Sequence, residues 1–520
     1  MRPSRRSAIG TALRVALAGW GAARAPRRAF ATSGFAADPF ALGVASGCPE
    51  HDSVVLWTRL APIPQRPDGG LDPEPVAVRW ELAEDERFTR VVRSGETVAL
   101  PERAHAVHVE ADGLSPSRWY WYRFVAGTAA QAARSPAGRT RTAPAPGAPS
   151  ERLAFAFASC QHYERGFYAA WRHLVDESPE LIVHLGDYIY ESNLSRDPVR
   201  RHWNDEPTTL EGYRLRHAQY RTDPDLQRAH AAAPWLVTWD DHEVDNDYAD
   251  DRAQDLAPGF LARRAAAYRA YFEHMPLRAL AAPAGPDMRL FGRWRFGDLA
   301  QFHLLDCRQY RSPQACPRPG RGGSNVVVDC AELAEPQRTM LGAAQERWLD
   351  LELRASRARW NVLAQSTLFA RFDLDPGPGT RYWTDGWSGY PAAADRLVRS
   401  IVDSRAANPL LIGGDFHAHY VADVLSDFGD PRSKIVATEF CGTSITSPGQ
   451  PQVRLDVARM GNPHLLLGDG TRRGYVSVVL EPDRCTAHLR VIDDPRDPHS
   501  PLATRASFVV ESGRPGAQPA

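Results

Sequence analysis

Side chains that can bind metal ions directly follow four apolar runs of this sequence. Thiolate, phenolate and imidazole groups suit a transition metal, whereas carboxylates and an amide suit a hard, oxygen-seeking cation. Both kinds of donor occur here, so the residue types are those of a metal site. The runs and their donors are 153–158 with Cys160, 181–185 with Asp187 and Tyr190, 235–239 with Asp241, His242 and Asn246, and 409–412 with Asp415 and His417.

These apolar runs have the composition of buried strands, and they alternate with helical stretches such as 262–275 and 343–357. This rhythm predicts an α/β domain. A lone Gly-Asp turn or a lone Cys after a strand usually has only a structural role. Here all four loops carry donors at the same place relative to a strand. Sites in open α/β sheets assemble at the carboxyl ends of strands, so we expect the four loops to meet in one crevice.

The sequence before this domain has a different pattern, with short strand-like runs at 54–60, 76–82, 105–110 and 118–126. Their aromatic and β-branched alternation predicts a small antiparallel β-sandwich at 38–142. Residues 143–150 are rich in Pro and Ala and are expected to link it to the α/β domain at 151–511. A final pair of strands, 474–480 and 485–492, is expected to close that domain before a polar tail.

The motifs around the donors resemble those of the PhoD-type alkaline phosphatases. The motifs are FASCQ with Cys160, HLGDYIYE with Asp187 and Tyr190, TWDDHEVDN with Asp241, His242 and Asn246, and GGDFH with Asp415 and His417. Further similar segments lie at 40–62, 220–235, 304–316 and 442–447. The resemblance therefore covers nearly the whole chain after its first 31 residues.

The resemblance implies an α/β (α+β) fold of the calcineurin-like metallophosphoesterase kind. Two β-sheets lie between helices in this fold, and an N-terminal antiparallel β-sandwich precedes them. The resemblance also implies ferric iron paired with calcium, with zinc or another divalent pair as the alternative. Asp187 would bridge the two metals. The expected iron ligands are Cys160, Tyr190 and His417, and the expected calcium ligands are Asp241, Asn246 and Asp415.

The expected reaction is hydrolysis of phosphate esters. Two cations would lower the pKa of a bridging water from ~15.7 toward ~7 and stabilise the charge that develops when the resulting hydroxide attacks phosphorus. His242 would donate a proton to the leaving-group oxygen. Its structural alternative is a histidine at a helix start that hydrogen-bonds Glu243. Arg308 and Arg311 are candidate substrate-binding residues, because a guanidinium matches phosphate oxygens.

Seven cysteines occur without metal-finger spacing. Cys316 and Cys330 flank a Pro- and Gly-rich stretch, and we expect a disulfide between them that stabilises the fold by about 3 kcal/mol in the chain-entropy model. Two positions depart from the family's pattern. Ser388 stands in the loop 383–390 where many relatives carry an acid, and Cys48 replaces an expected Asp. Because Ser388 could alter the mouth of the site, substrate preference is not carried over from the family.

The first 31 residues are predicted to be a twin-arginine signal peptide, with Arg5-Arg6, an apolar stretch at 12–23 and small residues at 29–31. We expect export through the twin-arginine machinery to a periplasmic or secreted location. Without these residues the chain has 55 basic and 63 acidic residues, a net charge of −8. That charge argues against nucleic acid or an anionic membrane as the main partner. No later stretch is long and apolar enough to span a bilayer.

Three alternatives stay open from the sequence. The same fold could act mainly on phosphodiesters, including phospholipids. Cys160 could be the nucleophile of a thiol hydrolase. Against this, Asp187, Asp241 and Asp415 would then cluster without a cation to neutralise them, at considerable cost. The third alternative is a secreted binding protein with an inactive site.

Overall fold

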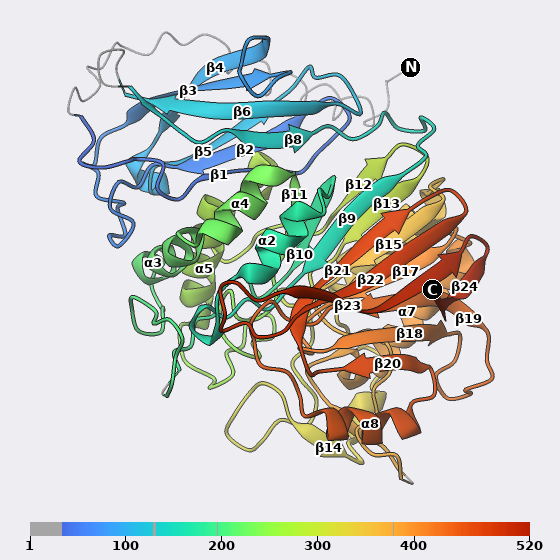
Figure 1. Ribbon diagram of the computed structural model, residues 1–520. Helices are drawn as coiled ribbons and strands as arrows, with labels where there is room; N and C mark the ends of the chain where they lie inside the picture. Colours follow the sequence, from blue (N-terminus) through green and yellow to red (C-terminus); the bar gives the residue numbers. More distant parts are fainter. Residues whose placement is uncertain (1–33, 128–131, 195, 378) are drawn as a thin grey trace, which may run out of the picture.

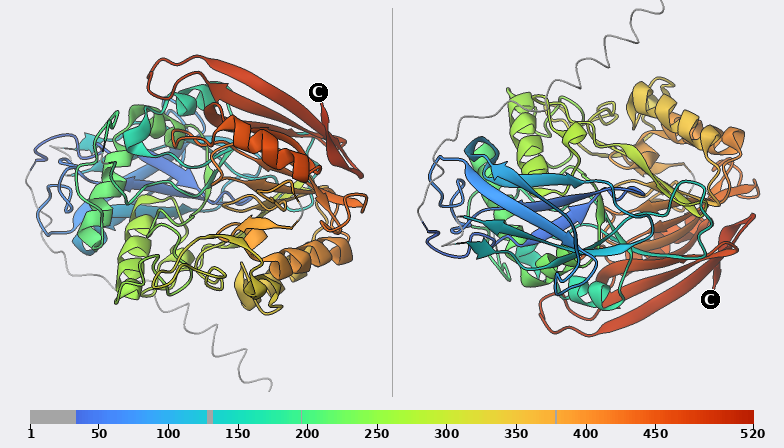
Figure 2. Two further views of the ribbon diagram at one scale, coloured as in Figure 1. Left: turned by 90° about the horizontal axis from the view of Figure 1, so that it is seen from below. Right: turned by 90° about the horizontal axis from the view of Figure 1, so that it is seen from above.

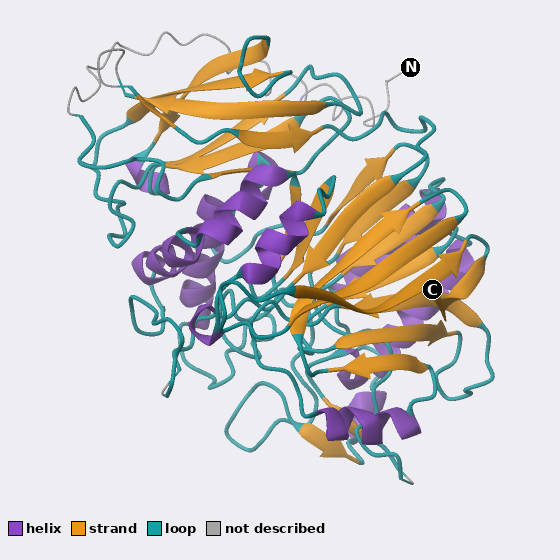
Figure 3. Cartoon of the chain, in the orientation of Figure 1, coloured by secondary structure: helices purple, strands orange, loops and turns teal. Residues whose placement is uncertain are grey.

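The computed structural model describes residues 34–127, 132–194, 196–377 and 379–520 (Figure 1). The predicted signal peptide at 1–31 lies outside these residues. Two large β-sheets form the body of the protein, and a smaller β-layer lies at the end where the described chain begins (Figure 3). Within the described ranges, no helix is long and apolar enough to cross a membrane.

The first large sheet has ten strands in the order β24-β23-β22-β21-β9-β10-β11-β1-β2-β5. At its centre β9 (Leu153–Ala158), β10 (Leu181–Leu185) and β11 (Trp235–Thr238) run parallel. These strands are continuous apolar runs because both of their faces are covered. The other strands are β1 (Val44–Gly47), β2 (Val54–Arg59), β5 (Ala106–Ala111), β21 (Arg473–Leu480), β22 (Arg484–Ile492), β23 (Leu502–Glu511) and β24 (Arg514–Pro519).

The second large sheet has seven strands in the order β12-β13-β15-β17-β19-β18-β20. Its strands are β12 (Gly292–Phe296), β13 (Ala300–Leu304), β15 (Trp360–Ala364), β17 (Pro409–Gly413), β18 (His419–Leu425), β19 (Ile435–Cys441) and β20 (Leu465–Asp469). An apolar core joins the two sheets. Phe155 of β9 meets Phe302 of β13 edge-on, with 5.1 Å between ring centroids, and Val362 of β15 belongs to the same cluster.

Helices cover the outer face of the seven-stranded sheet and that of the central strands of the ten-stranded sheet (Figure 2). On α7 (Pro391–Ser404), Leu397, Val398 and Ile401 recur at helical spacing and are buried against the seven-stranded sheet. The ten-stranded sheet is covered by α2 (Ala169–Asp176), α3 (Leu210–Arg221), α4 (Pro224–Ala232) and α5 (Phe260–His274), and the seven-stranded sheet by α6 (Gly342–Ala355) and α7 (Pro391–Ser404), while α8 (Gln452–Gly461) lies against β20. The α+β class and the order helix, sheet, sheet, helix agree with the expected fold.

The N-terminal layer is an antiparallel sheet in the order β4-β3-β6-β7, with β8 also paired to β6. Its strands are β3 (Val76–Ala83), β4 (Val91–Ala99), β6 (Trp119–Ala126), β7 (Ala133–Arg134) and β8 (Gly138–Arg141). It packs on β2 through a core that contains Leu56, Tyr122 and Phe124. Because β1 pairs with β11, the second layer of this sandwich is the edge of the ten-stranded sheet. Residues 143–150 carry no helix or strand.

The polar tail expected after residue 492 is wrong, because β23 and β24 form a hairpin that ends the ten-stranded sheet. Phe508, Val510 and Ala517 of this hairpin are buried in the core between the sheets. Exposed Thr504, Arg505 and Glu511 lie on the same strand as Phe508 and Val510, so the segment lacks a continuous apolar run although one face is buried. The sheet therefore extends to Pro519, beyond the expected boundary at 511.

A disulfide joins Cys316 and Cys330, the two cysteines expected to pair. The loop that it closes contains β14 (Val326–Val328), which pairs with β16 (Arg381–Trp383) in a small two-stranded sheet. The other five cysteines are free and buried. The disulfide thus braces a ribbon that also forms one side of the cavity described below.

Candidate active site

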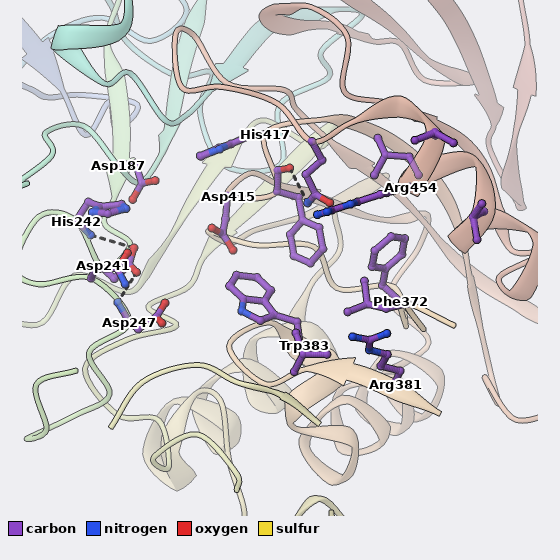
Figure 4. A pocket seen from close by; sticks show the side chains of 18 residues that line it. Asp187, Asp241, His242, Asp247, Phe372, Arg381, Trp383, Asp415, His417 and Arg454 are labelled. Atoms are coloured by element: carbon purple, nitrogen blue, oxygen red, sulfur yellow. Dashed lines mark hydrogen bonds between the residues drawn. The ribbon is translucent and has the colours of Figure 1, made fainter. Parts of the chain in front are cut away.

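The four donor-bearing loops meet at one edge of the two large sheets. Since β9, β10 and β11 are neighbouring parallel strands, the loops with Cys160, Asp187 and Asp241 leave the ten-stranded sheet at the same edge. The loop after β17 brings Asp415 from the seven-stranded sheet. Six of the predicted site residues line one cavity, namely Asp187, Asp241, His242, Asn246, Asp415 and His417 (Figure 4).

Sharp backbone turns follow these strands. The angle φ is 59° at Cys160, 56° at Asp187, 63° at Asp415 and 52° at His417, all in the left-handed region. Such conformations cost non-glycine residues roughly 1–3 kcal/mol each and persist only where the surrounding structure enforces them. The Cys160 amide donates to the Gly186 carbonyl at 3.2 Å, which ties two of the loops together. Four of the predicted metal ligands are therefore among the non-glycine residues that the fold holds in this conformation.

Cys160, Asp187 and His417 form the first donor group, in which one ligand atom of each lies within 4.8 Å of the others. The Tyr190 hydroxyl donates to Asp187 Oδ2 at 2.7 Å and lies 3.3 Å from His417 Nε2. His417 Nδ1 lies 3.0 Å from the Pro448 carbonyl oxygen, so Nδ1 carries the proton and the Nε2 lone pair faces the group. These are the four residues expected to hold iron.

The second donor group is richer in oxygen and shares Asp187 with the first. Asp187, Asp241 and His242 each offer one atom within 4.8 Å of the others. Asp241 also belongs to a buried group with Asp247 and Asp385. The last two were not singled out from the sequence, although Asp247 follows Asn246 directly. Asp187 belongs to both groups, as a bridging ligand would. The third member of the second group is His242, the predicted proton donor, and Asp415 belongs to neither group.

Burial and mutual repulsion oppose ionisation of the donors. Burial, followed by Asp187, raises the pKa of the Cys160 thiol well above its usual value, and the same two causes raise the pKa of Tyr190. Burial and neighbouring carboxylates raise the pKa of both Asp187 and Asp415. Burial lowers the pKa of His417 to about 3, which keeps its imidazole neutral, as a metal ligand must be.

These donors fit a pair of bound cations. Asp187 Oδ1 is buried and has no hydrogen-bond partner among the described residues. A buried carboxylate without a charge partner lowers the stability of the fold. A bound cation would neutralise these carboxylates, and it would also favour the thiolate form of Cys160 and the phenolate form of Tyr190. The burial of Cys160 and its raised pKa argue against a thiol nucleophile, which must be accessible and readily ionised.

His242 is held by a carboxylate and lines the cavity. Its Nδ1 lies 2.7 Å from Glu191 Oε2, and its ring stacks on Tyr190 with 4.1 Å between centroids. Burial disfavours the charged imidazolium, but Glu191, Asp241 and Asp187 outweigh burial and raise the pKa of His242 well above its usual value. Glu191 therefore engages Nδ1, and the charged form of the imidazole is favoured.

The structural alternative for His242, a hydrogen bond to Glu243, is wrong. Glu243 accepts instead from the backbone amides of Tyr188 at 2.6 Å, Asp240 at 2.9 Å and Asp187 at 3.2 Å. One carboxylate thereby fixes the loops after β10 and β11 relative to each other. Glu191 and Glu243 were not predicted as site residues, although each directly follows a predicted one in sequence.

The structure contradicts the substrate-binding role predicted for Arg308 and Arg311. Their side chains are 1% exposed and do not line the cavity. Arg308 pairs with Asp240 at 2.5 Å and with Asp385 at 2.7 Å, and Arg311 pairs with Asp385 at 3.2 Å. Although burial opposes ionisation of Asp241, Arg308 holds its pKa below the usual range. Both arginines therefore neutralise carboxylates behind the cavity.

This assignment predicts that Arg308→Met destabilises the fold. Removing one partner from a buried ion pair costs about 3–5 kcal/mol, because it leaves carboxylates buried and unpaired. Urea unfolding measures the loss. Arg432→Met is the matched control, since the Arg432 side chain is 93% exposed and should contribute at most about 1 kcal/mol. A raised KM at unchanged stability would instead support the original substrate-binding role.

Beyond the metal donors, the cavity continues into a region lined partly by aromatic side chains. Its volume is about 800 Å³, and its far wall includes Phe372, Trp383 and Phe416. Ser388, which departs from the family's pattern, does not line the cavity. Its hydroxyl accepts a hydrogen bond from the Phe372 amide at 2.9 Å. Ser388 therefore contacts the cavity only indirectly, through the backbone of Phe372 in its far wall.

Comparison with known proteins gives matches along nearly the whole chain. Residues 155–489 match the PhoD-like phosphatase family, and residues 24–144 match the N-terminal domain of PhoD-like phosphatases. Alkaline phosphatase D of Bacillus subtilis (strain 168) is 45% identical over 497 residues, which cover 94% of this chain and 83% of that protein. The solved structure of PhoD superposes with a TM-score of 0.88 at 44% identity, covering 94% and 93% of the two chains.

A more distant structure shares only the fold. Purple acid phosphatase PPD1 from yellow lupin (Lupinus luteus) seeds has a TM-score of 0.56 at 10% identity, covering 90% of this chain and 74% of that one. The closer matches are far above that level and include both domains. The chain belongs to the PhoD-like phosphatase family and is a phosphoric ester hydrolase.

Proposed function

We propose that this phosphatase is exported and metal-dependent, and that it hydrolyses phosphate esters in the cavity at the ends of β9, β10, β11 and β17. The observation that carries this proposal is the pair of donor groups that share Asp187. The buried carboxylates, with an Asp187 Oδ1 that has no hydrogen-bond partner among the described residues, support a bound cation at this place.

The donor chemistry supports two unlike metals. Ferric iron fits Cys160, Tyr190 and His417, calcium fits Asp241, Asn246 and Asp415, and Asp187 fits between them. When bound, such cations hold an anionic phosphate and lower the pKa of a water molecule to about 7. The protein's own residues complete the site. His242 donates a proton to the leaving oxygen, Glu191 orients the His242 ring, and Glu243 holds the loops together.

Elemental analysis of natively exported protein tests this proposal. We expect about one equivalent of iron together with calcium, and multiple-turnover hydrolysis of p-nitrophenyl phosphate. Asp187→Asn should lose both metal retention and hydrolysis, because it removes the bridging carboxylate. Undiminished hydrolysis by this variant would contradict the proposal.

A phosphodiesterase remains the second candidate, and the size of the cavity favours considering it. A phosphoryl group fills only part of about 800 Å³, so there is room for a second ester substituent. Rates with p-nitrophenyl phosphate and with its bis ester, measured on the same preparation, decide between the two. A higher kcat/KM for the bis ester would identify the diester as the preferred substrate.

We also propose that export uses the twin-arginine route, on the basis of Arg5-Arg6 and of metals best inserted before secretion. Replacing both residues (Arg5→Lys with Arg6→Lys) should leave the precursor inside the cell. Arg27→Lys with Arg28→Lys, which also preserves charge, is the control and should export normally. Immunoblots of cell and culture fractions measure the outcome. Normal export of the Arg5/Arg6 variant would contradict the proposed route.

A further inference from the structure

The far end of the cavity has an apolar, aromatic wall. Phe372, Trp383 and Phe416 line this end of the cavity. Figure 4 shows Phe372 and Trp383 on the side of Asp415 that faces away from Asp187 and Asp241. The ring centroids of Trp383 and Phe416 are 5.4 Å apart and those of Phe372 and Phe416 are 5.8 Å apart, both pairs edge-to-face. This arrangement is favourable for aromatic rings and makes one continuous surface for a further ring to pack on.

Two guanidinium groups line the same end of the cavity. Arg381 comes from β16 and Arg454 from α8, and Figure 4 shows both beside the aromatic wall. Both residues are exposed, and neither is paired with a carboxylate among the residues that the structure describes. Arg308, in contrast, forms ion pairs with the buried carboxylates of Asp240 and Asp385. Arg381 and Arg454 are therefore available to an anion that enters with a ligand.

The chain holds this end in place through several independent contacts. β16, which carries Arg381 and Trp383, pairs with β14 inside the loop closed by the disulfide. The Phe372 amide is tied to Ser388, as described above. On α8, the side-chain amide of Gln452 donates to the Gly468 carbonyl of β20 at 2.9 Å. A surface held this way loses little conformational freedom when it binds a ligand.

We infer that this end is a leaving-group subsite, which selects esters whose leaving group combines a planar apolar ring with a second negative charge. The inference rests on the proposed function, in which the scissile phosphate lies among the donors of Asp187 and Asp241. The ring packs on Trp383 and Phe416, and the remote anion lies between Arg381 and Arg454. A nucleotide with an additional phosphate and a carboxylated aryl ester share this chemistry.

Binding of non-hydrolysable phosphonates to the metal-loaded enzyme tests the subsite, with calorimetry as the readout. The probes are 4-(2-carboxyethyl)benzylphosphonate, its neutral methyl ester, and a straight-chain phosphonate that ends in a carboxylate. We expect the remote carboxylate to lower Kd about tenfold, the effect of one charge-assisted hydrogen bond. The aromatic ring should lower Kd about three- to tenfold relative to the straight-chain phosphonate.

The arginine variants should mainly remove the preference for the carboxylate, and the tryptophan variant should mainly remove the preference for the aromatic ring. Arg381→Gln combined with Arg454→Gln should bring the ratio of Kd values for the acid and its methyl ester close to one. Trp383→Leu should reduce the preference for the ring over the chain while the carboxylate preference is largely kept. Arg87→Gln, an exposed arginine of the N-terminal layer, is the matched control and should change neither ratio.

The outcomes separate this inference from the function on which it rests. Equal Kd values for acid and methyl ester in the wild type, or ratios unchanged in the arginine double variant, overturn the subsite even if p-nitrophenyl phosphate is hydrolysed. Absence of hydrolysis overturns the proposed function instead. Tighter binding of adenosine 3′,5′-bisphosphate than of adenosine 5′-monophosphate identifies a nucleotide as the source of the ligand. If the aryl carboxylate binds more tightly than its methyl ester but the two nucleotides bind equally, the ligand is a carboxylated aryl ester.

Discussion

Calcium chelation is expected to abolish hydrolysis while most of the protein's visible colour remains. The colour would arise from charge transfer between ferric iron and the Tyr190 phenolate or Cys160 thiolate. Calcium would exchange more readily, because the oxygen ligands proposed for it, Asp241, Asn246 and Asp415, would bind it with flexible geometry. Added calcium should restore the rate. Absorbance spectra and initial rates, recorded on the same samples before and after chelation, measure both effects.

Variants of the sulfur and phenolate donors should have the opposite effect. Tyr190→Phe or Cys160→Ser should bleach the colour and weaken iron retention, since each removes a ligand from the group around Asp187. Tyr188→Phe is the matched control, because the Tyr188 hydroxyl contacts His230 at 2.8 Å and not the donors. Colourless native protein with two equivalents of zinc and no response to calcium would disprove the assignment of two unlike metals.

Replacement of His242 should separate metal binding from catalysis. His242→Ala is expected to retain both metals and to lower kcat by on the order of 10²–10⁴, the usual contribution of a general acid. The loss should be smaller with p-nitrophenolate as the leaving group, which departs without much help from a proton. Steady-state kinetics with aryl and alkyl phosphates, together with elemental analysis, measure these outcomes.

Glu191 gives a second test of the same mechanism. Glu191→Gln keeps a hydrogen-bond acceptor for His242 Nδ1 but removes the charge, so kcat should fall less than in His242→Ala while KM stays close to the wild-type value. His488→Ala, on β22 and bonded to Ser507, is the control and should have normal kinetics. Loss of iron or calcium from His242→Ala would show that His242 is a ligand and not a proton donor.

Much of the architecture was predictable because buried parallel strands appear in a sequence as continuous apolar runs. The runs 153–158, 181–185 and 409–412 match β9, β10 and β17 to within one residue. Strands covered on both faces must be apolar throughout, and the chain must turn where the apolar run ends. The donors therefore fall at strand ends, which is why the loops that form the cavity could be named in advance.

The failures share a different physical cause. The hairpin of β23 and β24 was predicted as a polar tail, because only one face of these antiparallel strands is buried and the sequence therefore shows no continuous apolar run. The pairing of β1 with β11 was missed, because residues so far apart in sequence carry no local sign of the contact. Neither error affected the predicted site, since both lie away from the carboxyl ends of β9, β10 and β17.

By itself, the sequence determined which donor types this protein carries and where they stand relative to its strands, because both follow from local composition and spacing. Only the tertiary structure decided how the charges are used. Arg308 pairs with Asp240 and Asp385, whereas Arg381 and Arg454 have no carboxylate partner among the described residues and lie beside an aromatic wall. The partner of a charged side chain depends on which distant segments pack against it, and short-range sequence patterns do not contain that information.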